Sequence, residues 1–473
     1  MKRTLLLVLL LVISLGTVSV FASSIYKEHD NVTFKETVLY GDRSIANGLK
    51  VELNTHHASL LFWNTTSEFE GDVNSSTDYH FYSTRQDYTF PEYVAGISMH
   101  CNPDGTFFLE EENPTGLSAA YQEVFDSLAP GQEIEKTIYL KDYMDYYNFE
   151  LSFDFPNCHQ YGNTSELDIA TSDEIKQDPV LKALHDIKEY FKIPVLDTET
   201  YTISIGKHTN GNIASSGGGN TDSERFYMQT FSIVTDDTCF FTFKPHTTEG
   251  NLVDLSDLPE GYGLYALPFE RVSDDIQFDL STVKTDQISM VYPLDPNVQI
   301  TDMTLDETNS RIFLYTEDQE QLWLTVLDIA TMSTVQKFAL CNTTDSWQNV
   351  YNYTDFIAVF NSNPEEITLF SLNETNEYEL EFRCAFKPEG LENSYCYPSE
   401  LAYDGKRLAC SSTLRNYTYG NKNYCDYFIT VYDSDGLQYW VEFENSLDSG
   451  LDQDWYDYPC KSDDYNALRL SWK

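Results

Sequence analysis

The chain has 473 residues, of which 29 are basic and 76 acidic, so its formal net charge is −47. Such a negative field repels nucleic-acid phosphates and anionic lipid surfaces, which excludes nucleic acid as a partner. The acidic residues are interspersed with aromatic residues, which make up 15% of the chain, and they form no long block. This pattern is typical of a folded acidic surface and not of a disordered tail.

The first residues have the pattern of a secretory signal peptide. Lys2 and Arg3 precede an apolar run from Leu5 to Ile13, and Val20-Phe21-Ala22 offers the small residues that signal peptidase accepts. We therefore predict a signal peptide over residues 1–22 and an exported chain with no membrane span after cleavage. An uncleaved membrane anchor is the alternative, because residues 4–22 are nearly long enough to cross a bilayer. Cleavage leaves 27 basic residues against 76 acidic ones, a net charge of −49.

Strand signals dominate the following residues. Short apolar runs separated by Asn, Asp, Gly and Pro predict a β-rich, sandwich-like domain over residues 23–170. One helix interrupts the strands: Asp178 can cap it, Pro179 suits its first position, and Val180, Leu184, Ile187 and Phe191 form one apolar stripe. The glycine-rich stretch 206–224 that follows predicts a flexible hairpin tip or a connection between domains.

A unit of four strands then recurs. Residues 311–340, 355–386 and 407–445 each show strand, polar tip, strand, turn and strand, preceded by a further short strand; residues 226–294 give a fourth copy. The spacing of about 44 to 52 residues is that of a propeller blade. In layout the repeats resemble β-propeller repeat proteins, although they carry no WD pair, kelch double glycine or Asp-box. A two-sheet sandwich is the alternative.

These patterns predict an all-β fold in which a sandwich-like N-terminal region and one linking helix precede a β-propeller-like C-terminal region. The predicted organisation is a signal peptide (1–22), a sandwich-like domain (23–170), a helical connector (171–199) and a propeller-like domain (200–473). In the alternative organisation the whole chain forms one ring, closed where the hairpin at 36–54 joins the last strand, 467–473.

Few residues suggest binding or chemistry. Acidic turns offer oxygen ligands for calcium, the one cofactor that the sequence suggests, at Asp433, Asp435, Asp452 and Asp454. Aromatic platforms for sugar stacking are predicted at Trp63, Trp347, Trp440 and Trp455. Among the nine cysteines, Cys101 and Cys158 are predicted to form a disulfide. No nucleophile-elbow, zinc-protease or Cys–His signature is present.

The sequence therefore predicts an exported, non-catalytic protein whose propeller-like surface recognises a protein or glycan ligand at the cell exterior. The alternative is an extracellular carbohydrate-active enzyme that uses paired carboxylates. A purely structural role in the cell envelope is a third reading.

Overall fold

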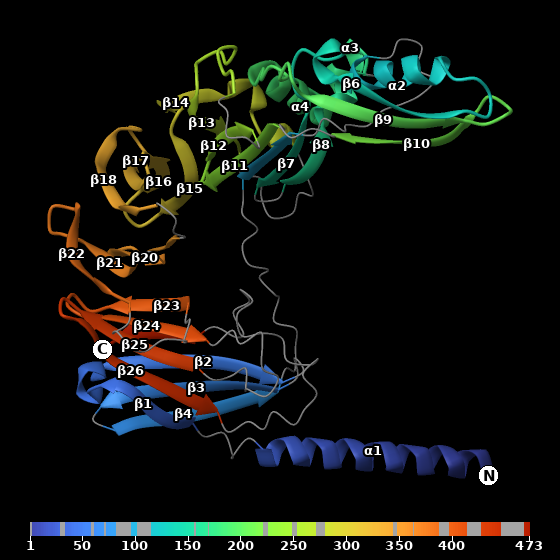
Figure 1. Cartoon of the computed structure of the whole chain (residues 1–473). Helices are drawn as coiled ribbons and strands as arrows, with labels where there is room; N and C mark the ends of the chain where they lie inside the picture. The colour runs from blue at the N-terminus through green and yellow to red at the C-terminus, as the bar shows by residue number, and fades with distance from the viewer. Residues whose placement is uncertain are drawn as a thin grey trace. The chain divides into compact units, whose positions relative to one another are not determined.

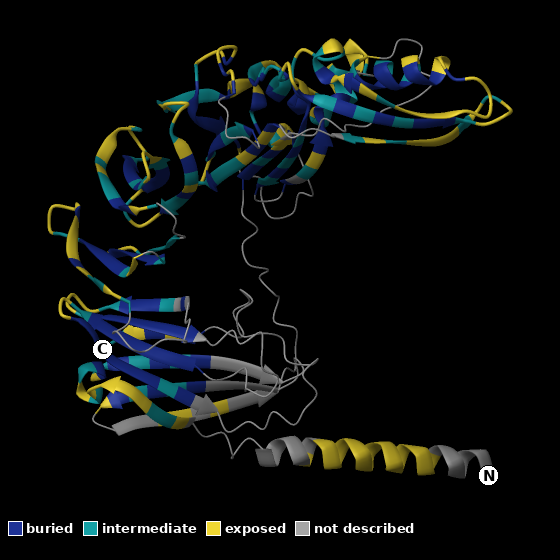
Figure 2. Cartoon of the chain, viewed as in Figure 1, coloured by how far each residue is buried: buried dark blue, intermediate teal, exposed yellow. Residues whose placement is uncertain are grey.

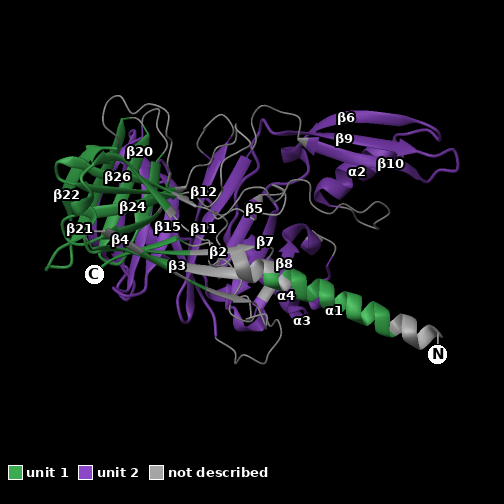
Figure 3. Cartoon of the chain, turned by 90° about the horizontal axis from the view of Figure 1, so that it is seen from below, with its two compact units in different colours: residues 1–91, 345–473 green, residues 92–344 purple. Residues whose placement is uncertain are grey.

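The computed structural model describes most of the chain. The described residues are 2–28, 34–57, 61–70, 72–81, 96–101, 115–155, 158–168, 170–220, 226–247, 253–270, 280–343, 348–362, 364–386, 397–413, 427–445 and 468–473. They fold into two compact units, which Figure 3 shows in different colours. Unit 1 comprises residues 1–91 and 345–473, and unit 2 comprises residues 92–344. The predicted domain boundaries at residues 170 and 199 stay a prediction.

Unit 1 contains three antiparallel sheets (Figure 1). A five-stranded sheet has the order β1 (Phe34–Gly41), β26 (Gly436–Asn445), β25 (Tyr427–Asp433), β24 (Leu408–Thr413) and β23 (Tyr397–Tyr403). A four-stranded sheet has the order β27 (Leu468–Trp472), β2 (Leu49–His57), β3 (Leu61–Glu70) and β4 (Asp72–Phe81). The third is a meander of β19 (Gln348–Asn352), β20 (Phe356–Ser362), β21 (Glu365–Leu372) and β22 (Tyr378–Ala385).

Unit 2 contains four sheets, two of them four-stranded meanders. These are β11 (Phe226–Val234), β12 (Thr238–Thr247), β13 (Gly263–Pro268) and β14 (Ser289–Pro293), then β15 (Gln299–Asp306), β16 (Arg311–Asp318), β17 (Gln321–Asp328) and β18 (Thr334–Asn342). Two three-stranded sheets have the orders β5 (Gly96–Cys101), β7 (Phe149–Phe155), β8 (Cys158–Asn163) and β10 (Ile213–Asn220), β9 (Thr200–Lys207), β6 (Glu133–Tyr139).

The four predicted repeats are confirmed, because each forms four consecutive antiparallel strands of one sheet, and the fold is all-β and propeller-like. In the repeat at 407–445, β1 adds a fifth strand beside β26. Burial follows the repeat. The first six residues of each of the strands β16, β20 and β25 are buried in succession, so both faces of these strands are covered (Figure 2). Alternating burial would indicate a sheet with one solvated face. Side chains that meet solvent lie instead at hairpin tips and along outer strands such as β18 and β22.

The strand ends of the repeat at 311–340 join in a tight turn. Gln319 and Glu320, between β16 and β17, have φ values of 50° and 64°, and the flanking Asp318 and Gln321 pair with each other. Two residues with positive φ define the hairpin turn whose twist matches that of the strands, a turn that normally contains Asn and Gly. This acidic tip is exposed, and Ile312 and Leu324 are fully buried.

The helices include one that the sequence predicted closely. α4 (Pro179–Tyr190) begins after Asp178, whose carboxylate accepts hydrogen bonds from the backbone N–H groups of Val180 (2.8 Å) and Leu181 (3.3 Å). Phe191, at its C-terminal end, packs edge-on against Phe241, Phe243 and Tyr265, with ring centroids 5.0–5.9 Å apart. α4 is thus anchored in the core of unit 2 by its apolar stripe.

The other α-helices among the described residues are α1 (Lys2–Glu28), α2 (Gly116–Asp126) and α3 (Ser172–Gln177). Residues 8–21 of α1 are exposed (Figure 2). Among the residues that the structure describes, no helix has both the length and the apolarity needed to cross a membrane.

The glycine-rich stretch after β9 is half turn and half strand. Residues 208–212 form the hairpin tip, which was one of the two predicted alternatives, but residues 213–220 continue as β10 against β9. Gly218 is required here, because a Cβ atom would lie 2.3 Å from the Tyr121 hydroxyl oxygen and 2.6 Å from the Tyr201 ring.

Both ends of the chain contribute strands to unit 1. β27 pairs with β2 from Leu49–Trp472 to Leu53–Leu468, as the ring-closure alternative expected. The predicted hairpin at 36–54 is wrong, because β1 pairs with β26 instead and a 3-10 turn at Arg43–Ala46 leads the chain into the next sheet. The sandwich-like region at 23–170 is β-rich as predicted, and its strands are distributed over four sheets.

The Arg407 guanidinium connects three segments of unit 1. It forms an ion pair with Asp404 (Nη2–Oδ2 2.7 Å) and donates to the backbone carbonyls of Ile45 and of Asn47, the latter at 3.2 Å. Its Cζ atom lies 4.1 Å from the centroid of a Trp472 ring. Cation–π contact and charge-assisted hydrogen bonds to backbone therefore join the β23–β24 turn, the turn after β1 and the last strand.

Replacing Arg407 with Ala should lower the free energy of unfolding of unit 1 by about 2–3 kcal/mol, because the cation–π contact and several hydrogen bonds are lost together. Urea unfolding followed by tryptophan fluorescence measures the change. Lys406→Ala, at the exposed neighbouring position, is the control and should stay within about 0.5 kcal/mol of the wild type. Equal stability of the two variants would contradict the role of Arg407.

Replacing Gln319 with Asn and Glu320 with Gly should stabilise unit 2 by about 1 kcal/mol, because both new residues accept positive φ at lower cost. The midpoint of denaturant unfolding measures the gain. Gln319→Ala is the control. Alanine keeps the Cβ atom, so this variant should show no gain in stability. A double variant less stable than the wild type would rule out turn strain at this tip.

Candidate functional site

An open groove of about 510 Å³ lies in unit 1, where the ends of strands from all three sheets meet. Its volume falls in the range of small-ligand pockets, about 300–1,000 Å³. The lining mixes two aromatic rings with carboxylates, a hydroxyl and an ammonium group. The residues are Asp355, Ser371, Leu372, Glu381, Tyr403, Asp404, Gly405, Trp472 and Lys473.

The turn between β23 and β24 positions one wall of the groove. Gly405 has φ +90°, a conformation that favours glycine, so the chain can reverse directly after Tyr403. The Asp404 carboxylate accepts hydrogen bonds from the backbone N–H groups of Lys406 (2.9 Å) and Arg407 (2.6 Å), and its other oxygen binds the Arg407 side chain. Asp404 is therefore committed to holding the turn.

The last strand positions the opposite wall. The Trp472 indole N–H donates to the carbonyl of Ala402 on β23 (3.0 Å), and the Lys473 backbone N–H donates to the carbonyl of Gly48 (2.9 Å). The Lys473 ammonium binds Glu68 (2.9 Å) and Glu70 (2.7 Å) on β3. These bonds raise the pKa of Lys473, Glu70 being the largest cause.

Tyr403 lies in a negative electrostatic field. Burial is the largest cause that raises its pKa to about 12, and the carboxylates of Glu381, Asp404 and Asp355 raise it further, in that order. The Tyr403 phenol is therefore neutral at physiological pH and can donate or accept a hydrogen bond. Ser371, with 9% of its surface exposed, donates a hydrogen bond to Glu381 and orients that carboxylate.

The predicted calcium residues are only partly within the described chain. Asp433 ends β25, and its carboxylate accepts a hydrogen bond from the Asp435 backbone N–H (2.8 Å) in the turn before β26. Only Gly436 has positive φ in this turn, at 103°, so the turn differs from the hairpin type with two positive φ values. Asp452 and Asp454 lie outside the described residues. Among the described residues no three His, Cys, Asp or Glu side chains form a metal-binding group, and calcium at these positions stays a prediction.

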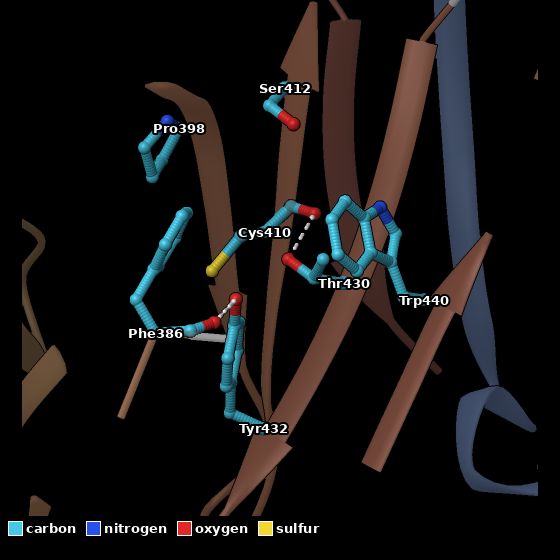
Figure 4. A pocket seen from close by; sticks show the side chains of 7 residues that line it. All are labelled: Phe386, Pro398, Cys410, Ser412, Thr430, Tyr432 and Trp440. Atoms are coloured by element: carbon cyan, nitrogen blue, oxygen red, sulfur yellow. Dashed lines mark hydrogen bonds between the residues drawn. The ribbon is translucent and has the colours of Figure 1, made fainter. Parts of the chain in front are cut away.

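The predicted stacking tryptophans differ in position. Trp440 is only 4% exposed and packs edge-on against Phe428 in the core of unit 1, so it presents no face to a sugar. It lines an internal cavity with Cys410 and Tyr432 (Figure 4), whose free space of about 10 Å³ admits about one water molecule. Trp63 lies in β3, and Trp347 and Trp455 lie outside the described residues. Stacking at these three residues stays a prediction.

The predicted disulfide between Cys101 and Cys158 is wrong. Cys101 lies opposite Phe149 and Cys158 opposite Phe155, at the two ends of β7. Six residues of strand separate these ends by about 20 Å, whereas a disulfide requires Cα atoms within about 7 Å. The cysteines are arranged for packing: burial raises the pKa of the Cys239 and Cys384 thiols to about 12, so both are poor nucleophiles at neutral pH.

The patterns in the sequence did not predict the groove, although one signal was present. Asp355 and Asp404 are acidic residues next to strand ends of two successive repeats, whereas Glu381 lies within β22. Aligning the repeats by strand and comparing their ends would have singled out Asp355 and Asp404. Trp472 and Lys473 could not be found in this way, because pairing of the two chain ends brings them to the groove.

No protein-family model and no curated protein matches the chain. The solved structures that it resembles include the periplasmic gluconolactonase of Pseudomonas aeruginosa (10% identity, 84% of this chain and 96% of that chain, TM-score 0.29). They also include the β-propeller domain of the Trilobed protease of Pyrococcus furiosus (9% identity, 63% of this chain and 67% of that chain, TM-score 0.22). A third is the WD40 domain of SCAP from fission yeast (8% identity, 88% of this chain and 91% of that chain, TM-score 0.26). At these TM-scores the likenesses carry no conclusion about the function of this chain.

Proposed function

We propose that the protein is an exported, non-catalytic binding protein and that the groove of unit 1 recognises a glycan. Glycan binding is supported above all by the lining of the groove. An open groove of about 510 Å³ combines the rings of Tyr403 and Trp472 with polar side chains around them. Sugar rings offer an apolar face for stacking and a rim of hydroxyl groups for hydrogen bonds. An aromatic ring beside carboxylate and hydroxyl acceptors complements both.

Export is the second part of the proposal. It is supported by the basic and apolar residues of the N-terminal segment and by Ala22 at the predicted cleavage site. The large negative charge of the chain agrees with an extracellular surface protein that must stay soluble.

Replacing Tyr403 with Ala should weaken binding of a glycan identified on an array by about tenfold or more, because the stacking ring and its hydroxyl are removed. Isothermal titration calorimetry with the purified glycan measures the loss. Tyr139→Ala, which removes an exposed tyrosine of unit 2, is the matched control and should bind as the wild type does. Release of new reducing ends from that glycan by the wild-type protein would favour the carbohydrate-active enzyme instead.

The mature N-terminus should be Ser23. Mass spectrometry of the protein recovered from the culture medium of a secreting bacterial host measures the mass of the N-terminal peptide. Ala22→Arg, which places a large charged residue at the cleavage site, should retain the N-terminal segment. A full-length wild-type protein confined to the cells would contradict export by this segment.

A further inference from the structure

We infer that the groove of unit 1 selects an amino sugar whose amine is unacetylated and protonated. This inference rests on the proposed function, because it names the ligand class of the same groove. The cavity and its aromatic rings define the site, and the balance of charged groups within it decides the ligand.

The cations that border the groove are already paired. Lys473 binds Glu68 and Glu70 on β3, at 2.9 and 2.7 Å. Arg407 binds Asp404 and the carbonyls of the turn after β1. Asp404 in turn is occupied by Arg407 and by two backbone N–H groups. None of these three side chains is available to neutralise a ligand without breaking the closure of unit 1.

Two carboxylates remain for the ligand. Asp355 and Glu381 form no ion pair with any cation among the residues that the structure describes, and Glu381 accepts one hydrogen bond, from Ser371. Both carboxylates act on Tyr403, whose pKa they help to raise to about 12 after the larger effect of burial. These carboxylates therefore create a negative potential at the phenol, and such a potential favours a cation nearby.

The size and shape of the site favour an amino sugar over a basic protein surface. The groove is concave and has the volume of a small-ligand pocket, whereas a protein partner requires a contact area of about 800 Å² on each side. Tyr403 offers a ring face and a hydroxyl within the same electrostatic environment as the two carboxylates. A hexosamine ring can stack on Tyr403 while its ammonium group binds Asp355 and Glu381. An acetylated amine has no charge and lacks this second interaction.

The test compares a glucosamine hexamer with an N-acetylglucosamine hexamer by isothermal titration calorimetry at pH 5.5 and low salt. The wild-type protein should bind the glucosamine hexamer at least tenfold more tightly. The double variant Asp355→Asn/Glu381→Gln should lose this preference and still bind the acetylated hexamer weakly through the rings. The double variant Glu374→Gln/Glu377→Gln is the control, since it removes two exposed carboxylates from the turn between β21 and β22 and should keep the preference.

Several outcomes would overturn the inference. Equal affinity for the two hexamers would show that the groove ignores the amine, while the proposed glycan binding would stand. An equal loss in both double variants would show attraction to the acidic surface in general. Binding of polylysine without binding of the glucosamine hexamer would replace the sugar with a basic peptide. Absence of binding by every glycan would overturn the proposed function itself. Unfolding midpoints of all variants confirm that each is folded.

Discussion

Pairing of the last strand with β2 is the constraint on which unit 1 depends. β27 forms five residue pairs with β2, and the Arg407 guanidinium stacks on Trp472 while binding the turn that precedes β2. Segments from the two ends of the sequence thus hold each other in one sheet. Without this pairing β2 would be an exposed edge strand. The Trp472 indole would also lose its hydrogen bond to the Ala402 carbonyl and its contact with the Arg407 guanidinium. The groove exists only because the same residues that close unit 1 also form its wall.

The blade-like architecture explains why the polar groove lies at strand ends. Strands such as β20 and β25 are buried over six consecutive residues, so both faces are filled by apolar packing and neither can carry a ligand-binding side chain. Hydrogen-bonding groups buried there without partners would cost about 1–3 kcal/mol each. Turns meet no such restriction. Asp404 accepts hydrogen bonds from two backbone N–H groups and from the Arg407 side chain. A turn residue can therefore both fix the backbone and carry charge.

Local patterns in the sequence predicted the local structure well. The strand-tip-strand repeats and the capped helix after Asp178 depend on residues near one another, and the structure confirms them. Features set by distant residues were not accessible. The hairpin expected at 36–54 is divided between two sheets because β26 and β27 each take one of its strands. Gly218 reads as loop in the sequence but lies in β10, where it pairs with Ile203 and where Tyr121 and Tyr201 leave no room for a Cβ atom. The burial of Trp440 and the separation of Cys101 from Cys158 are likewise properties of sheet order and register.

The location of the groove links the proposed glycan binding to the stability of unit 1. A ligand that binds only the closed form adds its binding free energy to folding, by about 2.7 kcal/mol at a concentration of 100 times its Kd. Tyr403 belongs to the turn that Asp404 and Arg407 fix, and Trp472 and Lys473 belong to the closing strand. Loosening of β27 therefore removes Trp472 and Lys473 from the lining of the groove, and it also removes the ring that packs against Arg407. By reciprocity, occupation of the groove opposes that loosening. Closure of the chain and the proposed ligand binding thus depend on one set of contacts.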